Sequence, residues 1–159
     1  MNDIYQVLQD LQIPYEKFEH PPVHTVEDSA KHYRGMDAGT SKNLFLRNAK
    51  GDSHYLVVIE STKRLDLKKL AEGLHERNLS FASPERLMTY LSLTPGSVSP
   101  FGLINNTDKS VKVIVDSDLL RFEKLSYHPN TNTATLVLAT EDIKKFLTWT
   151  GNSIEYRAL

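Results

Sequence analysis

The chain has 159 residues, of which 40% are hydrophobic and 25% are charged, and its formal net charge is −1 at pH 7. This composition is typical of a globular protein, and the length fits one domain with a sizeable core. The absence of cysteine excludes disulfides, a thiolate nucleophile, cysteine-ligated zinc and iron–sulfur clusters. The near-neutral charge argues against a protein that grips long nucleic acids by their phosphates, although a short nucleic-acid end is compatible with it.

The N-terminal segment, residues 1–11, is polar and amphipathic and lacks the apolar stretch of a signal peptide. No apolar run approaches the length that a membrane-spanning helix needs. Internal repeats and interdomain linkers are not found either. We therefore expect a single domain over residues 1–159, without a membrane partner, in the reducing cytoplasm that a cysteine-free chain suits.

The first part of the chain predicts two helices, a short strand and a β-hairpin. Apolar residues recur at helical spacing after a cap at Asn2 or Asp3, and Pro14 stops that helix. Two stretches of alternating residues, separated by a turn, predict the hairpin. The expected elements are a helix to about residue 12, a strand over 15–20, a helix over 26–33, and hairpin strands over 41–48 and 54–60.

The rest of the chain predicts capped helices and a second hairpin. Asp66 precedes one helical pattern, and Ser83 followed by Pro84 is a typical helix start. Thr140 is the expected cap of the last helix, and Gly151 the expected residue after its end. The further elements are strands over 79–81, 101–105 and 111–115, a helical turn over 116–120, a hairpin over 124–128 and 133–139, and an edge strand over 154–157.

The order of these elements indicates the fold class. Regular alternation of strands and helices, the mark of a parallel α/β sheet, is missing, and the hairpins favour antiparallel pairing. We therefore predict an α+β fold, in which a curled, mostly antiparallel mixed β-sheet of barrel-like shape has helices packed around it.

A loop rich in proline and glycine, Leu93-Thr94-Pro95-Gly96-Ser97-Val98-Ser99-Pro100, separates a predicted helix from a predicted strand. Its prolines fix φ and have no N–H, whereas Gly96 can adopt positive φ and permits close approach to its backbone. A loop of this kind can aim its amides at a ligand oxygen, as oxyanion holes do. The alternative is a rigid turn that leads into the next strand.

Lys42 begins the first hairpin strand, on the face that a period of two assigns to Leu44 and Leu46. Asn43, Phe45 and Arg47 belong to the other face. A lysine at this position is either an edge residue that extends its charge into solvent or a cation held at the mouth of a pocket.

Patterns for metal and cofactor chemistry are missing. Of six histidines, His20 and His24 are four apart, but on an extended proline-rich segment where this spacing does not converge as it does on a helix. H-E-x-x-H, G-x-S-x-G, the P-loop and the dinucleotide fingerprint are all absent from the sequence. We therefore expect no metal and no cofactor, and we assign no serine nucleophile.

Three segments occur in series: Lys42-Asn43-Leu44-Phe45-Leu46-Arg47, the loop Gly96-x-x-x-Pro100, and Tyr127-His128-Pro129-Asn130-Thr131-Asn132-Thr133-Ala134-Thr135. With this order and separation, nearly the whole chain resembles the YbaK/ProX family of prolyl-tRNA editing proteins. These are free-standing relatives of the editing insertion domain of bacterial prolyl-tRNA synthetase. The Asn-Leu-Phe-Leu run after the lysine is similar to the branch that clears alanine, whereas the cysteine-clearing branch has threonine after that lysine.

The resemblance implies a site. Lys42 matches the active-site lysine, which would hold the terminal nucleotide and the ester. Gly96 and Pro100 match the ends of the G-x-x-x-P loop, where amides near Gly96 and Ser97 would face the ester carbonyl. His128 matches the histidine that helps to place the aminoacyl group, although by itself it would read as a hairpin-corner histidine bonded to its own turn. The expected substrate-binding residues are Asn43, Ser97, Val98, Ser99 and Pro100.

The implied reaction is hydrolysis of the ester in mischarged tRNA for proline, with alanyl-tRNA as the expected substrate. An aminoacyl ester is already activated, so positioning and stabilisation of the developing oxyanion suffice, and the family's attacking water is aided by the terminal ribose hydroxyl. The expected partner is the tRNA acceptor end, with prolyl-tRNA synthetase as a further candidate. The basic side chains that would form a rim for it, or else be ordinary solvated charge, are Lys31, Arg34, Lys42, Arg47 and Lys50.

Several alternatives stay open at this stage. The chain could be a non-catalytic module that binds tRNA ends or a synthetase, a deacylase for cysteine, serine or threonine, or a metal-dependent hydrolase. Selectivity for alanine would require pocket walls that clash with the proline ring, because attraction for one methyl group supplies only about 1–3 kcal/mol. The sequence does not identify those walls.

Overall fold

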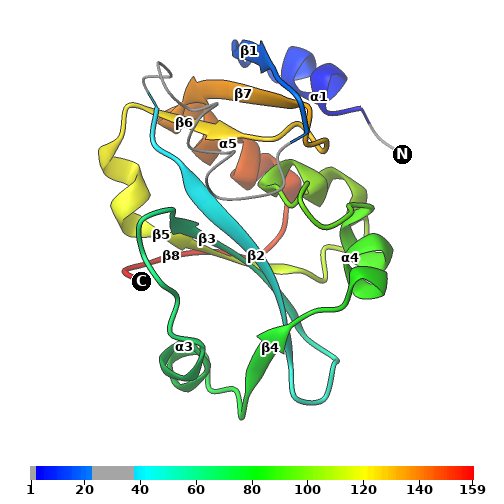
Figure 1. Cartoon of the computed structure of the whole chain (residues 1–159), viewed down its shortest axis with the longest axis vertical. Coiled ribbons are helices and arrows are strands. Elements are labelled where there is room, and N and C mark those ends of the chain that lie inside the picture. Colours follow the sequence, from blue (N-terminus) through cyan, green and yellow to red (C-terminus); the bar gives the residue numbers. More distant parts are fainter. Residues whose placement is uncertain (1–2, 23–37) are drawn as a thin grey trace.

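The computed structural model describes residues 3–22 and 38–159, whose strands form two sheets. The strands are β1 (Glu16–Glu19), β2 (Ser41–Asn48), β3 (His54–Glu60), β4 (Leu79–Phe81), β5 (Lys112–Asp116), β6 (Lys124–Tyr127), β7 (Ala134–Ala139) and β8 (Ile154–Arg157). One sheet has the order β1-β7-β6 and the other the order β4-β2-β3-β5-β8. In Figure 1 the first lies at the top and the second crosses the middle of the molecule.

The predicted α+β fold class is confirmed, and most strand pairs are antiparallel. The exceptions in the described chain are β3 with β5 and β5 with β8, which run parallel. The barrel-like closure is not seen there, because the two sheets meet only through an isolated bridge between Gly39 and Leu125. Strand β8 lies at the edge of the larger sheet, as predicted.

The helices in the described ranges are α1 (Ile4–Asp10), α3 (Leu67–Gly73), α4 (Pro84–Leu91) and α5 (Thr140–Thr150), and the first three begin at side-chain caps that the sequence identified. Asp3, Asp66 and Ser83 each accept a hydrogen bond from a backbone N–H in the first turn of α1, α3 and α4. The helix predicted over residues 26–33 lies outside the described residues. None of the helices in the described ranges has the length and apolar character needed to span a bilayer.

Two local predictions are wrong. Residues 101–105 are not a strand but part of a 3-10 helix, η1 (Pro100–Asn105), in which the Ser99 hydroxyl accepts from the Phe101 N–H. Ser99-Pro100 is thus a helix start like Ser83-Pro84, hidden by an apolar run that is buried on all sides. Thr140 is the first residue of α5 rather than its cap, because its hydroxyl donates to the Phe122 carbonyl, 2.6 Å away.

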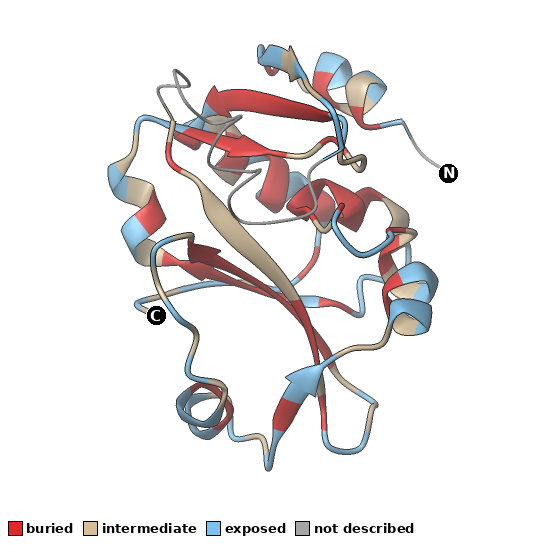
Figure 2. Ribbon diagram, viewed as in Figure 1, coloured by how far each residue is buried: buried red, intermediate tan, exposed pale blue. Residues whose placement is uncertain are grey.

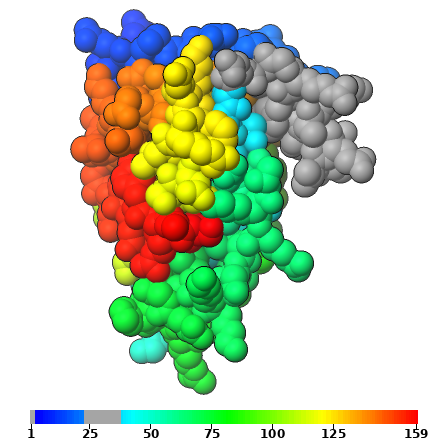
Figure 3. All heavy atoms as spheres, turned by 90° about the vertical axis from the view of Figure 1, so that its left-hand side faces the viewer, coloured from blue at the N-terminus to red at the C-terminus, as the bar shows by residue number. Residues whose placement is uncertain are grey.

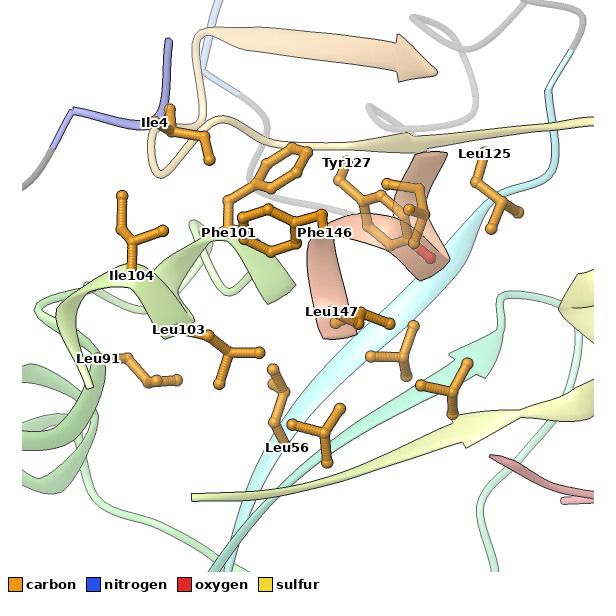
Figure 4. Packing of buried hydrophobic residues seen from close by; sticks show 14 of the residues in the cluster. Ile4, Leu56, Leu91, Phe101, Leu103, Ile104, Leu125, Tyr127, Phe146 and Leu147 are labelled. Carbon is orange, nitrogen blue, oxygen red and sulfur yellow. The ribbon is translucent and has the colours of Figure 1, made fainter. Parts of the chain in front are cut away.

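The core has two parts, one on each face of β3, and every residue of β3 is therefore buried. Leu56 and Val58 face the larger part, which also holds Phe101 and Phe146, with ring centroids 5.2 Å apart. Figure 4 shows these two rings beside Tyr127 and Leu125 of β6. The smaller part lies between the sheet and α3. The core thus fixes β6, η1 and α5 relative to β2 and β3.

The C-terminal strand is anchored by a buried carboxylate. Asp116 is fully buried and accepts hydrogen bonds from Lys63 Nζ at 3.1 Å and from the Glu60 N–H at 3.1 Å. Lys63 Nζ also donates to the Leu159 carbonyl at 2.9 Å. Figure 3 shows the red C-terminal segment packed beneath the yellow segment that holds η2 (Ser117–Arg121). These contacts hold the C-terminal segment to β5, at the end of β3 that is paired with the start of β2.

Candidate active site

The first half of β2 is half-buried and lies at an open sheet edge. Strand β4 pairs with β2 only over Leu46–Asn48, so the described chain offers no pairing strand along Ser41–Leu44. Figure 2 shows this upper part of β2 as intermediate in burial, next to the fully buried β3. A ligand can therefore approach this part of β2 from the side, as far as the described residues determine.

Asn43 joins β2 to the proline- and glycine-rich loop. Its Nδ2 donates to the Val98 carbonyl at 3.2 Å, and its Oδ1 accepts from the Ser41 hydroxyl at 3.0 Å. Both ends of the Asn43 amide are thus bonded to protein atoms. The structure gives this side chain a positioning contact with the loop, where the sequence predicted a contact with substrate.

The loop itself contains a tight turn around Gly96, whose φ is +90°. The Ser97 N–H donates to the Thr94 carbonyl at 3.0 Å, so it is not available to a ligand in this conformation, contrary to expectation. The amides of Gly96 and Val98 have no acceptor among the described residues. Ser99 and Pro100 are buried and begin η1, which gives them a structural part in holding the loop.

His128 has one ring nitrogen bonded and the other open. Its Nδ1 donates to the Ala134 carbonyl at 2.9 Å, which fixes the tautomer and leaves the lone pair on Nε2. Within residues 3–22 and 38–159, Nε2 has no hydrogen-bond partner. Burial lowers the pKa of His128, and the bond to Ala134 only partly opposes this. A neutral imidazole with an open acceptor is the result. The hydrogen bond between His128 and its own turn, which the sequence suggested as the alternative to a substrate contact, is therefore present.

The loop and the turn after β6 lie against each other. A Cβ placed on Gly96 would be 3.9 Å from Asn132 Nδ2, and Asn130 Nδ2 donates to the Phe101 carbonyl at 3.3 Å. Tyr127 is buried, which raises the pKa of its hydroxyl, and the Ser41 side chain opposes this only in part. The three segments identified in the sequence therefore meet at the start of β2.

His20 is a member of this cluster that the sequence did not reveal. Its ring meets the His128 ring edge-on, with centroids 6.0 Å apart, and its Nε2 lies 2.9 Å from the Thr135 hydroxyl. The contact results from the pairing of β1 with β7, in which Glu19 is opposite Ala134. This register leaves no local signal in the sequence.

Lys42 does not share these contacts. It is paired with Ile59, on the face of β2 that carries Leu44 and Leu46, whereas Asn43 lies on the other face. No described contact brings its ammonium group to Gly96 or His128. Of the expected basic rim, Lys31 and Arg34 lie outside the described residues, and Arg47 and Lys50 lie at the far end of β2.

Metal binding finds no support in the described part of the chain. Across residues 3–22 and 38–159, no group of three or more histidine, aspartate or glutamate side chains is arranged to hold a metal ion. Among the described residues, the groups at the start of β2 that could act on a ligand are the open amides, the neutral imidazole and the lysine at the sheet edge.

Comparison with known proteins gives a consistent result. A family model described as the aminoacyl-tRNA editing domain matches residues 20–146. The chain is 44% identical over 149 residues to the prolyl-tRNA editing protein ProX of Acetoanaerobium sticklandii, covering 93% of this chain and 90% of that protein. It is 36% identical to prolyl-tRNA synthetase associated domain-containing protein 1 of Bos taurus, covering 92% of this chain and 88% of that protein.

Solved structures show the same fold. A crystal structure described as a candidate trans-editing enzyme for prolyl-tRNA synthetase superposes with a TM-score of 0.69, at 21% identity, over 96% of this chain and 94% of that one. The family match extends over most of the chain and includes all three segments that meet at the start of β2. The chain therefore belongs to the aminoacyl-tRNA editing domain family, as its resemblance to YbaK/ProX proteins implied.

Proposed function

We propose that this protein is a trans-editing deacylase that hydrolyses the ester of mischarged tRNA for proline, with alanyl-tRNA as its substrate. The observation that carries this proposal is the meeting of three separate segments at one open strand edge, through the bonds of Asn43 to Val98 and of Asn130 to Phe101. Family membership and the 44% identity to ProX support the same reaction.

The open amides suit the developing oxyanion. Attack of water on the ester carbonyl carbon places negative charge on the carbonyl oxygen, and the N–H groups of Gly96 and Val98 are the donors proposed to face it. The bond between the carbonyl carbon and the ribose oxygen then breaks. The ribose oxygen takes up a proton that the attacking water supplies, and the free amino acid leaves.

The imidazole of His128 can accept a hydrogen bond from the substrate or from the attacking water. Its open Nε2 can accept from the attacking water or from the hydroxyl of the terminal ribose, which would orient the nucleophile. Because the neutral form is the acceptor, the lowered pKa of His128 favours this task at pH 7.

Lys42 is proposed to hold the terminal nucleotide from the open edge of β2. A lysine carries its charge on a flexible four-carbon stem, so a residue on one face of an edge strand can reach around it. The acceptor end of the tRNA is thus the part that is held. Prolyl-tRNA synthetase, which supplies the mischarged tRNA, is a candidate partner, and the cytoplasm is the proposed location.

A panel of mischarged tRNAs tests the proposal. The purified protein should release alanine from tRNA for proline and leave prolyl-tRNA intact. Release of cysteine, serine or threonine instead would keep the reaction but change the substrate. Binding without cleavage of any of these esters would reject catalysis in favour of a tRNA-end binding module. Activity that survives exhaustive chelation would eliminate the metal-dependent alternative.

A further inference from the structure

Two arginines from different elements converge at the tip of the β2–β3 hairpin. Arg47 of β2 donates from Nε to the Asn48 carbonyl at 3.2 Å and from Nη2 to the Ala49 carbonyl at 3.2 Å. Arg86 of α4 donates from Nη1 to the Gly51 carbonyl at 3.0 Å. A Cβ placed on Gly51 would lie 2.9 Å from Nη2 of each arginine. With Lys50, exposed between them in the turn, they form what we term the hairpin-tip cluster.

The cluster keeps a positive charge. Neither arginine forms an ion pair within residues 3–22 and 38–159. The neighbouring carboxylate, Asp52, accepts from Asn48 Nδ2 at 2.7 Å instead. His54 is also bonded to Arg86 but brings no negative charge: its Nε2 accepts a hydrogen bond from Arg86 Nη1 at 3.0 Å. Burial and then the charges of Arg86 and Arg47 lower the pKa of His54, and the carboxylate of Asp52 opposes this only in part.

The guanidinium groups still have donors to offer. Each has five N–H groups, and the bonds described above use two on Arg47 and two on Arg86. The planar fork of a guanidinium matches the oxygens of a phosphate, and a side chain already fixed by backbone carbonyls loses little entropy when it binds one. Both arginines are half-buried, so ordering them on binding costs less than it would for exposed side chains.

The cluster lies on the same face of β2 as Asn43. Asn43, Phe45 and Arg47 alternate with residues that face α3, and His54 is paired with Arg47. Asn43 and Arg47 are four residues apart, which spans about 13 Å on a strand. A single-stranded RNA end whose ester lies beside Asn43 can cover that distance within a few nucleotides, on a path outside Phe45, which is buried.

We propose that the hairpin-tip cluster binds a backbone phosphate of the RNA that carries the aminoacyl group, a few nucleotides from its esterified end. This assignment rests on the proposed function, because it places one molecule of RNA across both sites. It explains how a chain with a net charge of −1 could hold RNA, since only one or two phosphates need to be gripped. The rival surface is the opposite face of the sheet, where α3 exposes Lys68 and Lys69.

Matched charge removals on the two faces test the proposal. The affinity for uncharged tRNA is measured over a range of salt concentrations for Arg47→Gln/Lys50→Gln and for Lys68→Gln/Lys69→Gln. The first pair should weaken binding about fivefold to twentyfold and reduce the slope of log affinity against log salt by about 1–2, because contacts to phosphates are lost. The second pair should change the affinity less than twofold. Equal effects of the two pairs, or an unchanged affinity in the first, would overturn the proposal.

Two further measurements separate binding from folding and from catalysis. Lys50→Gln alone changes an exposed side chain that makes no described contact with the turn. It should still weaken binding, by part of the loss seen in Arg47→Gln/Lys50→Gln. The alanyl ester of adenosine carries no phosphate, so Arg47→Gln/Lys50→Gln should hydrolyse it at the wild-type rate. A matching loss with this small ester would overturn the proposal, because the substitutions of Arg47 and Lys50 would then act by disturbing the fold. Failure of the wild-type protein to cleave any ester would reject the proposed function and leave the binding result standing.

Discussion

The side-chain amide of Asn43 donates a hydrogen bond to the backbone carbonyl of Val98, 55 positions later in the chain and 3.2 Å away. This bond attaches the loop around Gly96 to the strand that carries Lys42. It also orients the peptide that follows Val98. The precision of the proposed oxyanion donors therefore depends on one side chain that does not itself face the substrate.

Replacement of Asn43 should affect the rate more than substrate binding. Asn43→Asp keeps the acceptor for Ser41 but removes the donor for Val98, so the loop loses its attachment. We expect kcat to fall about tenfold to a hundredfold with little change in KM, because misplaced donors act on the transition state. Steady-state kinetics and hydrogen exchange of the loop amides measure both consequences. A rise in KM at constant kcat would instead restore Asn43 as a substrate contact.

Removal of the Lys42 ammonium should abolish turnover. Lys42→Ala loses the group proposed to hold the terminal nucleotide and ester, and we expect kcat/KM to fall by at least about a hundredfold. Lys42→Arg keeps the charge but not the compact shape, so it should recover only part of the rate. Lys68→Ala, an exposed lysine on α3, is the control. Normal rates in Lys42→Ala would remove this residue from the mechanism.

The rate should depend on pH through His128. Because burial lowers the pKa of His128, its neutral form persists below the ordinary value of about 6.5, and the acid limb of kcat should lie below that pH. His20 contributes a smaller lowering, so His20→Gln should move the acid limb to higher pH. A pH–rate profile of each protein measures this. An acid limb that persists unchanged in His128→Gln would show that another group titrates.

Stability should fall in mild acid because of His54. Burial, Arg86 and Arg47 lower its pKa, so the folded protein binds a proton less readily than the unfolded chain does. The stabilisation is fully present above about pH 6.5, where both states are neutral, and it is lost as pH falls towards the lowered folded-state value. Urea unfolding at pH 7.5, 6.5 and 5.5 should show this loss. His54→Gln should flatten it, and the exposed control His75→Asn should not.

A methyl group on Gly39 should destabilise the junction between the two sheets. The Cβ of Gly39→Ala would collide with the Phe122 ring, next to the bridge from Gly39 to Leu125. We expect a loss of about 1–3 kcal/mol in the free energy of unfolding, typical of overpacking. Thermal unfolding measures it, and Gly39→Ala/Phe122→Leu should recover part of the loss. Equal stability of the single variant and the wild type would contradict the tight contact.

Local signals in the sequence predicted most of the secondary structure. Caps at Asp3, Asp66 and Ser83 act within three residues of themselves, and the hairpin strands follow from alternation within a short window. The resemblance of three segments also identified the family, which the comparisons confirmed. The run after Ser99 was misread because burial on all sides hides the helical period.

The tertiary structure alone decided which of these segments touch, and how. Strand register and core packing bring together three hydrogen-bonded pairs that are 55, 115 and 35 residues apart in the chain: Asn43 with Val98, His20 with Thr135, and Arg86 with Gly51. A shift of one residue in the pairing of β2 with β3 would turn Asn43 to the other face of the sheet. The sequence by itself therefore determined the elements and the family. Only the fold determined that Asn43 positions the loop, that His128 keeps an open Nε2 and that two arginines share one turn, because these depend on long-range pairing that no local pattern encodes.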